Sequence, residues 1–289
     1  MPPYEPPSYL SPSGAEDLAR CPARYELSHL MRLRQPGYVS PLTLGSATHA
    51  AARHLRESAD PGAVDQAIAI GQGIIETDAA KHDYDCVRDV AKLRAMVAGY
   101  HEALEPLRTE LNEIPLSAPV RNGDAQICAW LFGYADAFVK GGRYVFELKT
   151  TSDTLNEVES TLRAGLQVPF YLYAAELYGL APLGAICDVI KKPVIAKRKN
   201  ESTEDWSQRA LEAYQADPGR FFRRIVIDYD EACIAAAMDK YVYLSKMQKY
   251  YLQHGFVAVP GQGCKGPFGW CYYRGLCWFD RADEYVIRP

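Results

Sequence analysis

A pair of glycines between two apolar runs constrains this chain more than any other feature. The stretch reads Gly133-Tyr-Ala-Asp136-Ala-Phe-Val139, followed by Lys140-Gly141-Gly142-Arg143, and continues as Tyr-Val-Phe-Glu147-Leu-Lys149.

 A glycine pair between apolar runs is typical of a two-residue β-hairpin turn. If the two glycines form the turn, Lys140 pairs with Arg143 and, counting outward, Asp136 lies directly opposite Glu147.

This pairing predicts a site for a divalent metal ion. Directly opposed residues on one face of a hairpin have Cβ atoms about 4.5–5.5 Å apart. Lys149 points to the same face as Glu147, because side chains alternate along a strand. Two carboxylates held this close repel each other unless a cation lies between them, and the lysine could orient or help deprotonate a metal-bound water. The alternative is an acidic pair on a solvated sheet, but the apolar neighbours favour a covered one.

Bulk properties bound the class of protein. The chain has 289 residues, of which 48% are hydrophobic and 24% charged, as in an ordinary globular domain. No apolar run approaches the ~18–20 residues of a membrane span, and the Pro-rich start lacks the features of a secretory signal. We therefore expect a cytoplasmic protein that does not enter a membrane. The net charge of −4 argues against binding of polyanions through bulk charge alone.

The hydrophobic periodicity predicts a single α/β domain without internal repeats. Helices are expected over residues 11–31 (with a break at Pro22), 45–58, 62–79, 86–107, 155–163, 166–178, 204–216 and 230–254. Strands are expected over residues 116–121, 125–138, 143–150, 184–191 and 224–228.

Three further residues are candidate site residues because of their positions on predicted helices. His49 lies early in a helix, four residues after Gly45, although a lone histidine is more often a surface side chain than a metal ligand. Gln167 and Tyr171 share one helical face and could bind phosphate, a base or metal-bound water, but the spacing alone makes chance the better explanation. Pro169 is tolerated only in a first helical turn, so their helix should begin near Gln167.

Cysteines cluster in the C-terminal tail. Cys264, Cys271 and Cys277 are separated by six and five residues in a segment rich in glycine and aromatic residues. This spacing suggests thiolate ligation of an iron–sulfur cluster or zinc, and Cys21, beside a proline at a helix start, is the candidate fourth ligand. The remaining cysteines, at positions 86, 128, 187 and 233, are expected to be ordinary thiols.

Two basic runs stand out against the acidic background. One comprises Lys191-Lys192 with Lys197-Arg198-Lys199, and the other is Arg220-Phe-Phe-Arg223-Arg224. Each is more typical of a solvated loop than of a phosphate track, and each matters only if the site acts on a polyanion.

Taken together, these motifs resemble the RecB-like branch of the PD-(D/E)XK nuclease superfamily. The similarity is to members with an iron–sulfur cluster, which include CRISPR-associated RecB-like exonucleases, the AddB nuclease domain and phage exonucleases. It runs from Cys21 to Cys277 and comprises Gly45-x-x-x-His49, Asp136, Glu147-x-Lys149, Gln167-x-x-x-Tyr171 and the four cysteines. Two details depart from the family pattern: the tail cysteines are more widely spaced than usual, and Ala135 replaces the proline before the aspartate.

The resemblance implies a fold and a set of ligands. The expected fold is an α/β restriction-endonuclease-like core with a mixed central sheet flanked by helices, a helical part at 45–110, a catalytic core at 111–228, and an iron–sulfur region formed by 1–31 plus 255–289. It implies that His49, Asp136, Glu147 and the carbonyl of Leu148 hold Mg²⁺ or Mn²⁺, that Lys149 positions the attacking water, and that Gln167 and Tyr171 lie beside it. Cys21, Cys264, Cys271 and Cys277 would hold a structural [4Fe–4S] cluster, with Zn²⁺ as the alternative, and Arg24, Lys197, Arg198 and Lys199 would contact DNA phosphates.

The implied function is that of a metal-dependent DNA exonuclease acting on single strands or duplex ends. It would serve recombination, repair, or phage or CRISPR DNA processing as a cytoplasmic protein, prokaryotic or phage-encoded, alongside partner proteins of those pathways. Three alternatives stay open: an endonuclease or RNA-directed nuclease, a DNA-binding subunit with a vestigial nuclease centre, and a purely structural zinc protein. The last leaves the hairpin carboxylates unexplained.

Overall fold

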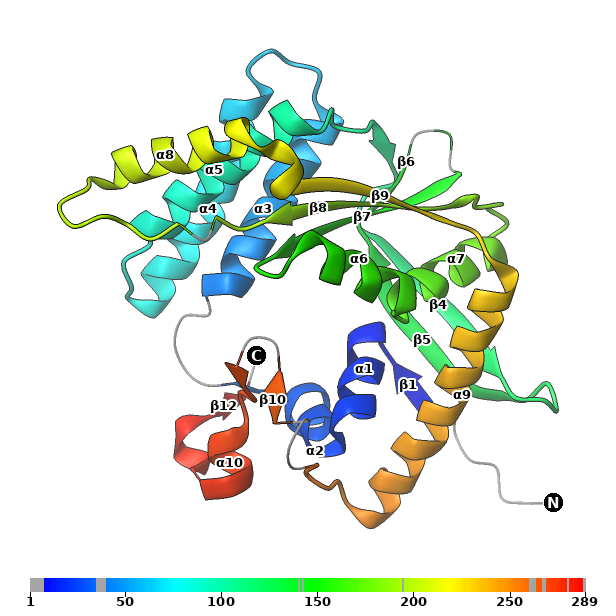
Figure 1. The fold of residues 1–289 in the computed structure, drawn as a ribbon. Helices are drawn as coiled ribbons and strands as arrows, with labels where there is room; N and C mark the ends of the chain where they lie inside the picture. Colours follow the sequence, from blue (N-terminus) through cyan, green and yellow to red (C-terminus); the bar gives the residue numbers. More distant parts are fainter. Residues whose placement is uncertain are drawn as a thin grey trace.

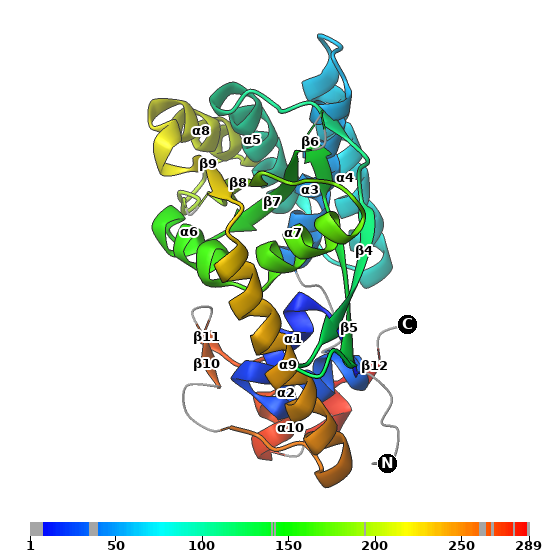
Figure 2. The same ribbon diagram turned by 90° about the vertical axis from the view of Figure 1, so that its right-hand side faces the viewer.

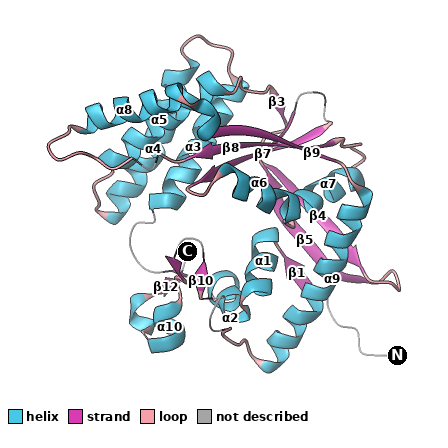
Figure 3. Cartoon of the chain, viewed as in Figure 1, coloured by secondary structure: helices cyan, strands magenta, loops and turns pink. Residues whose placement is uncertain are grey.

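The computed structural model describes residues 8–34, 40–139, 141, 143–193, 195–259, 264–266, 269–279 and 281–287 (Figures 1 and 3). The helices are α1 (Pro12–Arg20), α2 (Pro22–Tyr25), the π-helix η1 (Glu26–Leu30), α3 (Ser40–Glu57), α4 (Ala63–His82), α5 (Val87–Ala103), α6 (Leu155–Ala164), α7 (Gln167–Leu177), α8 (Thr203–Ala216), α9 (Glu231–His254) and α10 (Arg274–Phe279). The strands are β1 (Ser8–Leu10), β2 (Leu33–Arg34), β3 (Thr109–Glu110), β4 (Ile114–Arg121), β5 (Ile127–Ala135), β6 (Ala137–Val139), β7 (Tyr144–Thr151), β8 (Gly184–Lys191), β9 (Phe222–Asp228), β10 (Lys265–Gly266), β11 (Gly269–Trp270) and β12 (Val286–Ile287). The predicted α/β class, with mixed sheets flanked by helices, is confirmed.

Two sheets organise the described part of the chain. The larger has the order β3-β6-β7-β8-β9, in which β7 and β8 are parallel and the other pairs are antiparallel. The smaller has the order β1-β5-β4, with β1 parallel and β4 antiparallel to β5. Two-stranded pairs, β10 with β11 and β12 with β2, lie outside these sheets.

Helices cover both faces of the larger sheet. Helices α3, α4, α5 and α8 form a layer on one face, where they pack against side chains such as Phe146 and Leu148 of β7 (Figure 1). On the other face, α6 and α7 pack against alternating residues of the same strand, among them Val145. The smaller sheet joins this second core together with α1 and α9 (Figure 2). Strand β7 is therefore buried from both sides, which places its polar residues in the interior.

The hairpin register is the predicted one, although the strand before it is divided. Ala137 pairs with Phe146 and Phe138 with Val145, so the same register extended by one residue sets Asp136 opposite Glu147. We expected a single strand over 125–138, and this was wrong: the chain bends at Asp136, so β5 belongs to the smaller sheet and β6 to the larger one. The predicted turn itself involves Lys140 and Gly142, which lie outside the described residues.

Local sequence signals explain where the helices near the site begin. Helix α7 starts at Gln167 and carries Pro169 in its first turn, as predicted. Helix α6 begins with a capping box, in which the Thr154 hydroxyl accepts from the Glu157 N–H and the Glu157 side chain accepts from the Thr154 N–H. These two starts fix the helices that follow β7 and so determine which of their side chains reach its polar residues.

The N-terminal segment that holds α2, η1 and β2 lies beside the C-terminal segment. Strand β12 pairs with β2, and Leu27, Tyr273 and Tyr285 form a small apolar cluster between the N-terminal and C-terminal segments. The Ala23 N–H donates to the carbonyl of Val257 at 3.1 Å. The predicted break at Pro22 also occurs, because α1 ends at Arg20 and α2 begins at Pro22. In the described part of the chain, no helix has the length and apolarity needed to cross a membrane.

Candidate active site

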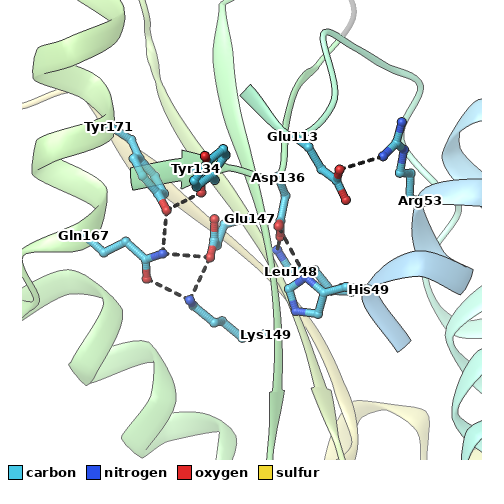
Figure 4. A network of polar contacts seen from close by, with 10 residues as sticks. All are labelled: His49, Arg53, Glu113, Tyr134, Asp136, Glu147, Leu148, Lys149, Gln167 and Tyr171. Carbon is cyan, nitrogen blue, oxygen red and sulfur yellow. Dashed lines mark hydrogen bonds and ion pairs between the residues drawn. The ribbon is translucent and has the colours of Figure 1, made fainter. Parts of the chain in front are cut away.

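Asp136 occupies the bend between the two sheets and receives bonds from two directions. Its Oδ2 accepts from the backbone N–H of Leu148 at 2.7 Å, and its Oδ1 lies 3.3 Å from Nδ1 of His49 (Figure 4). Helix α3 brings His49 across from the other side of β7. Burial by itself raises the pKa of Asp136, but the hydrogen bond and charge of His49 and the N–H of Leu148 outweigh it, so the pKa lies below its usual value. The carboxyl group is therefore an anion at neutral pH.

Glu147 is the most buried acid of the site, with 3% of its surface exposed. Its Oε1 accepts from Nζ of Lys149 at 2.7 Å and from Nε2 of Gln167 at 3.0 Å. Its Oε2 is buried and has no hydrogen-bond partner among the residues that the structure describes. Burial raises the pKa of Glu147, although the charge of Lys149 opposes the shift. Leaving such an acceptor unsatisfied costs about 1–3 kcal/mol, so this oxygen is a candidate ligand for a cation.

Lys149, Gln167 and Tyr171 form one chain of hydrogen bonds. Lys149 Nζ donates to Gln167 Oε1 at 2.7 Å, and Gln167 Nε2 donates to the Tyr171 hydroxyl at 2.7 Å. The hydroxyl in turn donates to the carbonyl of Tyr134 at 2.5 Å. Burial lowers the pKa of Lys149, but the charge of Glu147 outweighs this and the net pKa is raised, which keeps the ammonium protonated. Gln167 and Tyr171 were weak signals by spacing, yet the fold places both against the Glu147–Lys149 pair.

The ligand atoms of the site are of the chemical kind that binds a hard divalent cation, although their arrangement does not surround one. In the described segments, no group of three or more His, Cys, Asp and Glu side chains is placed to hold a metal ion as it stands. Carboxylate oxygens and an imidazole nitrogen are nevertheless groups that bind such ions. The unpartnered Oε2 of Glu147 and the Asp136–His49 pair provide these groups at one location.

Two residues beside Asp136 gave no signal in the sequence. The N–H of Glu113 donates to the carbonyl of Asp136 at 2.8 Å, and Glu113 has a left-handed backbone with φ of 51°. Arg53, one helical turn after His49, lies 3.1 Å from the Glu113 carboxylate and 2.8 Å from that of Glu57 (Figure 4). Neither residue belongs to a motif, and only the packing of α3 on the turn before β4 brings them to the site.

The four candidate cysteine ligands gather where the chain ends meet. The Val259 N–H lies 3.5 Å from the sulfur of Cys21, and the thiol of Cys264 lies 3.7 Å from the Val259 carbonyl. The Cys271 N–H donates to the Cys264 carbonyl at 2.6 Å. Burial raises the pKa of the Cys277 thiol, and the nearby thiols of Cys271, Cys21 and Cys264 add to the shift. The sulfur atoms thus lie near one another. As at the polar cluster, however, the described residues include no group of three or more ligand side chains that is placed to hold a metal ion.

The predicted DNA contacts take no part in the hydrogen bonds described for the polar cluster, and Arg24 lies in α2, three residues after Cys21. Nε of Arg24 is 2.7 Å from a carboxylate oxygen of Asp17, so its charge is already compensated. Lys197 Nζ donates to the Thr203 hydroxyl at 3.2 Å, and Arg198 and Lys199 are exposed in the loop between β8 and α8 (Figure 1). Whether any of the four binds phosphate stays a prediction.

The mixed α/β fold and the polar cluster are those expected of a nuclease, and comparison with known proteins specifies the family. A family model described as the PD-(D/E)XK nuclease superfamily matches residues 9–277. The chain belongs to this superfamily. Members of it typically use divalent metal ions and act on nucleic acid.

Two solved structures resemble the chain. A protein from Eubacterium rectale described as a "putative exonuclease" aligns with a TM-score of 0.53 and 14% sequence identity, over 98% of this chain and 90% of that one. A phage-related exonuclease from Haemophilus somnus 129PT aligns with a TM-score of 0.36 and 12% identity, over 72% of this chain and 94% of that one. At these identities the first likeness shows a shared fold. A search of curated proteins gives no match.

Proposed function

We propose that this chain is a metal-dependent DNA exonuclease that hydrolyses phosphodiester bonds. One observation carries the proposal: a buried glutamate, Glu147, has one oxygen held by Lys149 and Gln167 and the other without a partner. In a nuclease fold, an unpartnered buried carboxylate oxygen beside a second carboxylate is the arrangement that a divalent cation completes.

The residues that would hold Mg²⁺ or Mn²⁺ are His49, Asp136, Glu147 and the carbonyl of Leu148. When bound, such an ion stabilises charge on the scissile phosphate and makes a bound water more acidic. His49 suits this role in the tautomer that donates Nδ1–H to Asp136, because Nε2 then keeps its lone pair for a ligand. The same hydrogen bond holds the aspartate in position.

The other residues of the site orient the nucleophile. Lys149 keeps a positive charge because Glu147 lies beside it, so its ammonium can position the attacking water and balance the negative charge of the phosphate. Gln167 holds Lys149 and Glu147 at once, and Tyr171 fixes the amide of Gln167. We assign Gln167 and Tyr171 the role of positioning residues next to the DNA strand.

We also propose that the chain belongs to the RecB-like branch with a [4Fe–4S] cluster on Cys21, Cys264, Cys271 and Cys277. The meeting of both chain ends at these cysteines supports a structural role for the cluster, since metal binding supplies folding energy to segments that otherwise fray. Zn²⁺ on the same thiols is the alternative.

Two observations support the exonuclease assignment. The structural neighbour from Eubacterium rectale carries an exonuclease description, and the motif order matches RecB-like exonucleases. We place the enzyme in the cytoplasm of a prokaryote or a phage-infected cell, where it would process DNA in recombination, repair or CRISPR-related steps with partner proteins. Arg24, Lys197, Arg198 and Lys199 are proposed phosphate contacts.

The test compares linear and circular substrates with Mg²⁺ or Mn²⁺. We expect degradation of linear DNA that stops with a chelator and falls roughly 10³-fold or more in Asp136→Ala, because the metal loses a ligand. Asp124→Ala, in the exposed turn between β4 and β5, is the matched control and should cleave normally. Cutting of circular single strands would establish an endonuclease instead. Undiminished cleavage by Asp136→Ala would overturn the assignment of the site.

A further inference from the structure

One face of the smaller sheet is packed and the other is open to solvent. Residues of β5 at odd positions, such as Leu131 and Gly133, face α1, α7 and α9, and a Cβ on Gly133 would lie 2.8 Å from the ring of Phe170. On the opposite face, Tyr9 is 63% exposed, Phe132 48% and Tyr134 70%. These three residues are called the aromatic track below. Large apolar side chains gathered on an exposed face mark a binding surface.

The aromatic track leads directly to the proposed active site. Phe132 and Tyr134 lie on the outer face of β5, and Asp136 follows Tyr134 by two residues, in the bend where the strand ends. The Tyr9 ring on β1 lies against that of Phe132, with centroids 5.9 Å apart and planes 28° from parallel. The backbone carbonyl of Tyr134 accepts from the Tyr171 hydroxyl, so the track is attached to the polar network by the main chain while its rings stay outside.

The strands that carry the track have no negative charge. Strands β1, β4 and β5 contain no aspartate or glutamate, and Arg121 is their one charged residue. This is notable in a chain whose net charge is −4. Pro115 and Pro119 lie on the edge strand β4, opposite Tyr134 and Trp130, and prolines on an edge strand discourage pairing with a strand of another chain.

We infer that the aromatic track binds the single-stranded part of the nucleic-acid substrate by stacking of bases on Tyr134, Phe132 and Tyr9. The inference rests on the proposed nuclease function, since it is the position beside Asp136 that identifies the ligand. Stacking tolerates any sequence, because every base has a π-face, and it needs bases that are not paired in a duplex. The track therefore favours unpaired strands or frayed ends and gives the site a preference that phosphate contacts alone do not supply.

A second copy of this chain is the rival occupant of the same face. Continuity with the active site favours nucleic acid, because a protein partner on this face would cover the approach to Asp136. The absence of acidic residues from these strands also favours nucleic acid, because an interface between two copies of the chain does not require a surface without negative charge.

The test measures binding without catalysis. The full-length protein is titrated, in EDTA, against a fluorescent oligothymidylate and an abasic strand of the same length. We expect Tyr134→Ala, Phe132→Ala and Tyr9→Ala each to weaken binding of oligothymidylate by at least about 5-fold and to leave binding of the abasic strand unchanged. Tyr134→Trp should keep the affinity. The matched control is Tyr243→Ala, which removes an equally exposed tyrosine, 63%, from α9.

Three results would overturn the inference. These are wild-type affinity in the alanine variants, equal loss with both strands, and a dimer that dissociates in the variants, which would make the face an interface between copies. Size-exclusion chromatography and thermal melting identify a dimer or a misfolded variant. The binding assay contains no divalent metal, so it can fail independently of the cleavage assay. A protein that binds bases but cleaves nothing when metal is added would reject the nuclease function. Cleavage by the wild type, with unchanged binding in the alanine variants, would reject the aromatic track.

Discussion

The polar cluster around Asp136 and the cysteine group at the chain ends are both proposed ligand sites, yet they are built in different ways. The side chains of the polar cluster stand on β7, α3 and α7, and hydrogen bonds of 2.7–3.0 Å connect Glu147, Lys149 and Gln167. The cysteines stand at helix ends and in short segments, and the sulfur contacts of Cys21 and Cys264 are 3.5 and 3.7 Å long.

This difference teaches where each site gets its geometry. Regular elements and mutual hydrogen bonds hold the polar cluster in place before any ligand arrives, as electrostatic catalysis requires. The cysteine group depends on two distant ends of the chain remaining together, so a bound cluster would supply much of its order. We therefore expect substitutions in the polar cluster to change chemistry and substitutions of the cysteines to change the stability of the ends.

Among the substitutions that compare these two regions, the largest effect is expected from Lys149→Met. The substitution keeps the length of the side chain but removes the charge that Glu147 and Gln167 bind, so the cleavage rate should fall about 10²–10³-fold, and the melting temperature should also fall because the buried Glu147 loses its partner. Initial rates on labelled linear DNA, together with thermal melting, measure both. Lys92→Met is the matched control, because Lys92 makes a similar contact with Asp89 at 2.8 Å on α5. Equal losses in the two variants would show that general charge, not the site, is responsible.

An intermediate effect is expected from Cys21→Ser. If the four thiols hold an iron–sulfur cluster, the anaerobic wild-type protein is brown with absorbance near ~400 nm, and the variant loses this colour. The chain ends should then open more often, and limited proteolysis within 255–289 should become about 10- to 100-fold faster.

The control for this experiment is Cys233→Ser, which alters an exposed cysteine on α9 and should keep the colour. A colourless wild-type protein containing one zinc ion would reject the iron–sulfur cluster but keep the ligand site. Loss of cleavage without faster proteolysis would contradict the separation of the two regions.

The pairing of Asp136 with Glu147 could be predicted from local signals, whereas His49, Gln167 and Tyr171 were assigned to the site only through the family resemblance. The glycine pair predicted the register that places Asp136 opposite Glu147, and Pro169 predicted the start of the helix that carries Gln167. Both signals act within a few residues. The residues that were missed, Glu113 and Arg53, meet only through the packing of α3 against the turn before β4, and no local pattern encodes that contact.

The division of the expected strand at Asp136 shows the same limit. An uninterrupted apolar run predicts a continuous strand, but it does not reveal that its two halves belong to different sheets. Strand β1 was also missed, because three residues near a Pro-rich start carry too little periodicity. The contact between Tyr9 and Phe132 depends on the pairing of β1 with β5, so the aromatic track could not be predicted from the sequence.

The smallest effect is expected from Gly133→Ala, which tests how firmly the backbone fixes the polar cluster. A Cβ at this position would lie 2.8 Å from Phe170 and 3.3 Å from Tyr171, so β5 or α7 must shift. We expect a loss of about 1–2 kcal/mol in the free energy of unfolding and a modest fall in cleavage rate, because Tyr171 positions Gln167. Gly123→Ala, with no neighbour within 4 Å, is the control and should change neither. If Gly133→Ala lowers stability but leaves the cleavage rate unchanged, a shift of Tyr171 does not displace Gln167. The hydrogen bonds of the polar cluster would then position its side chains less rigidly than their lengths indicate.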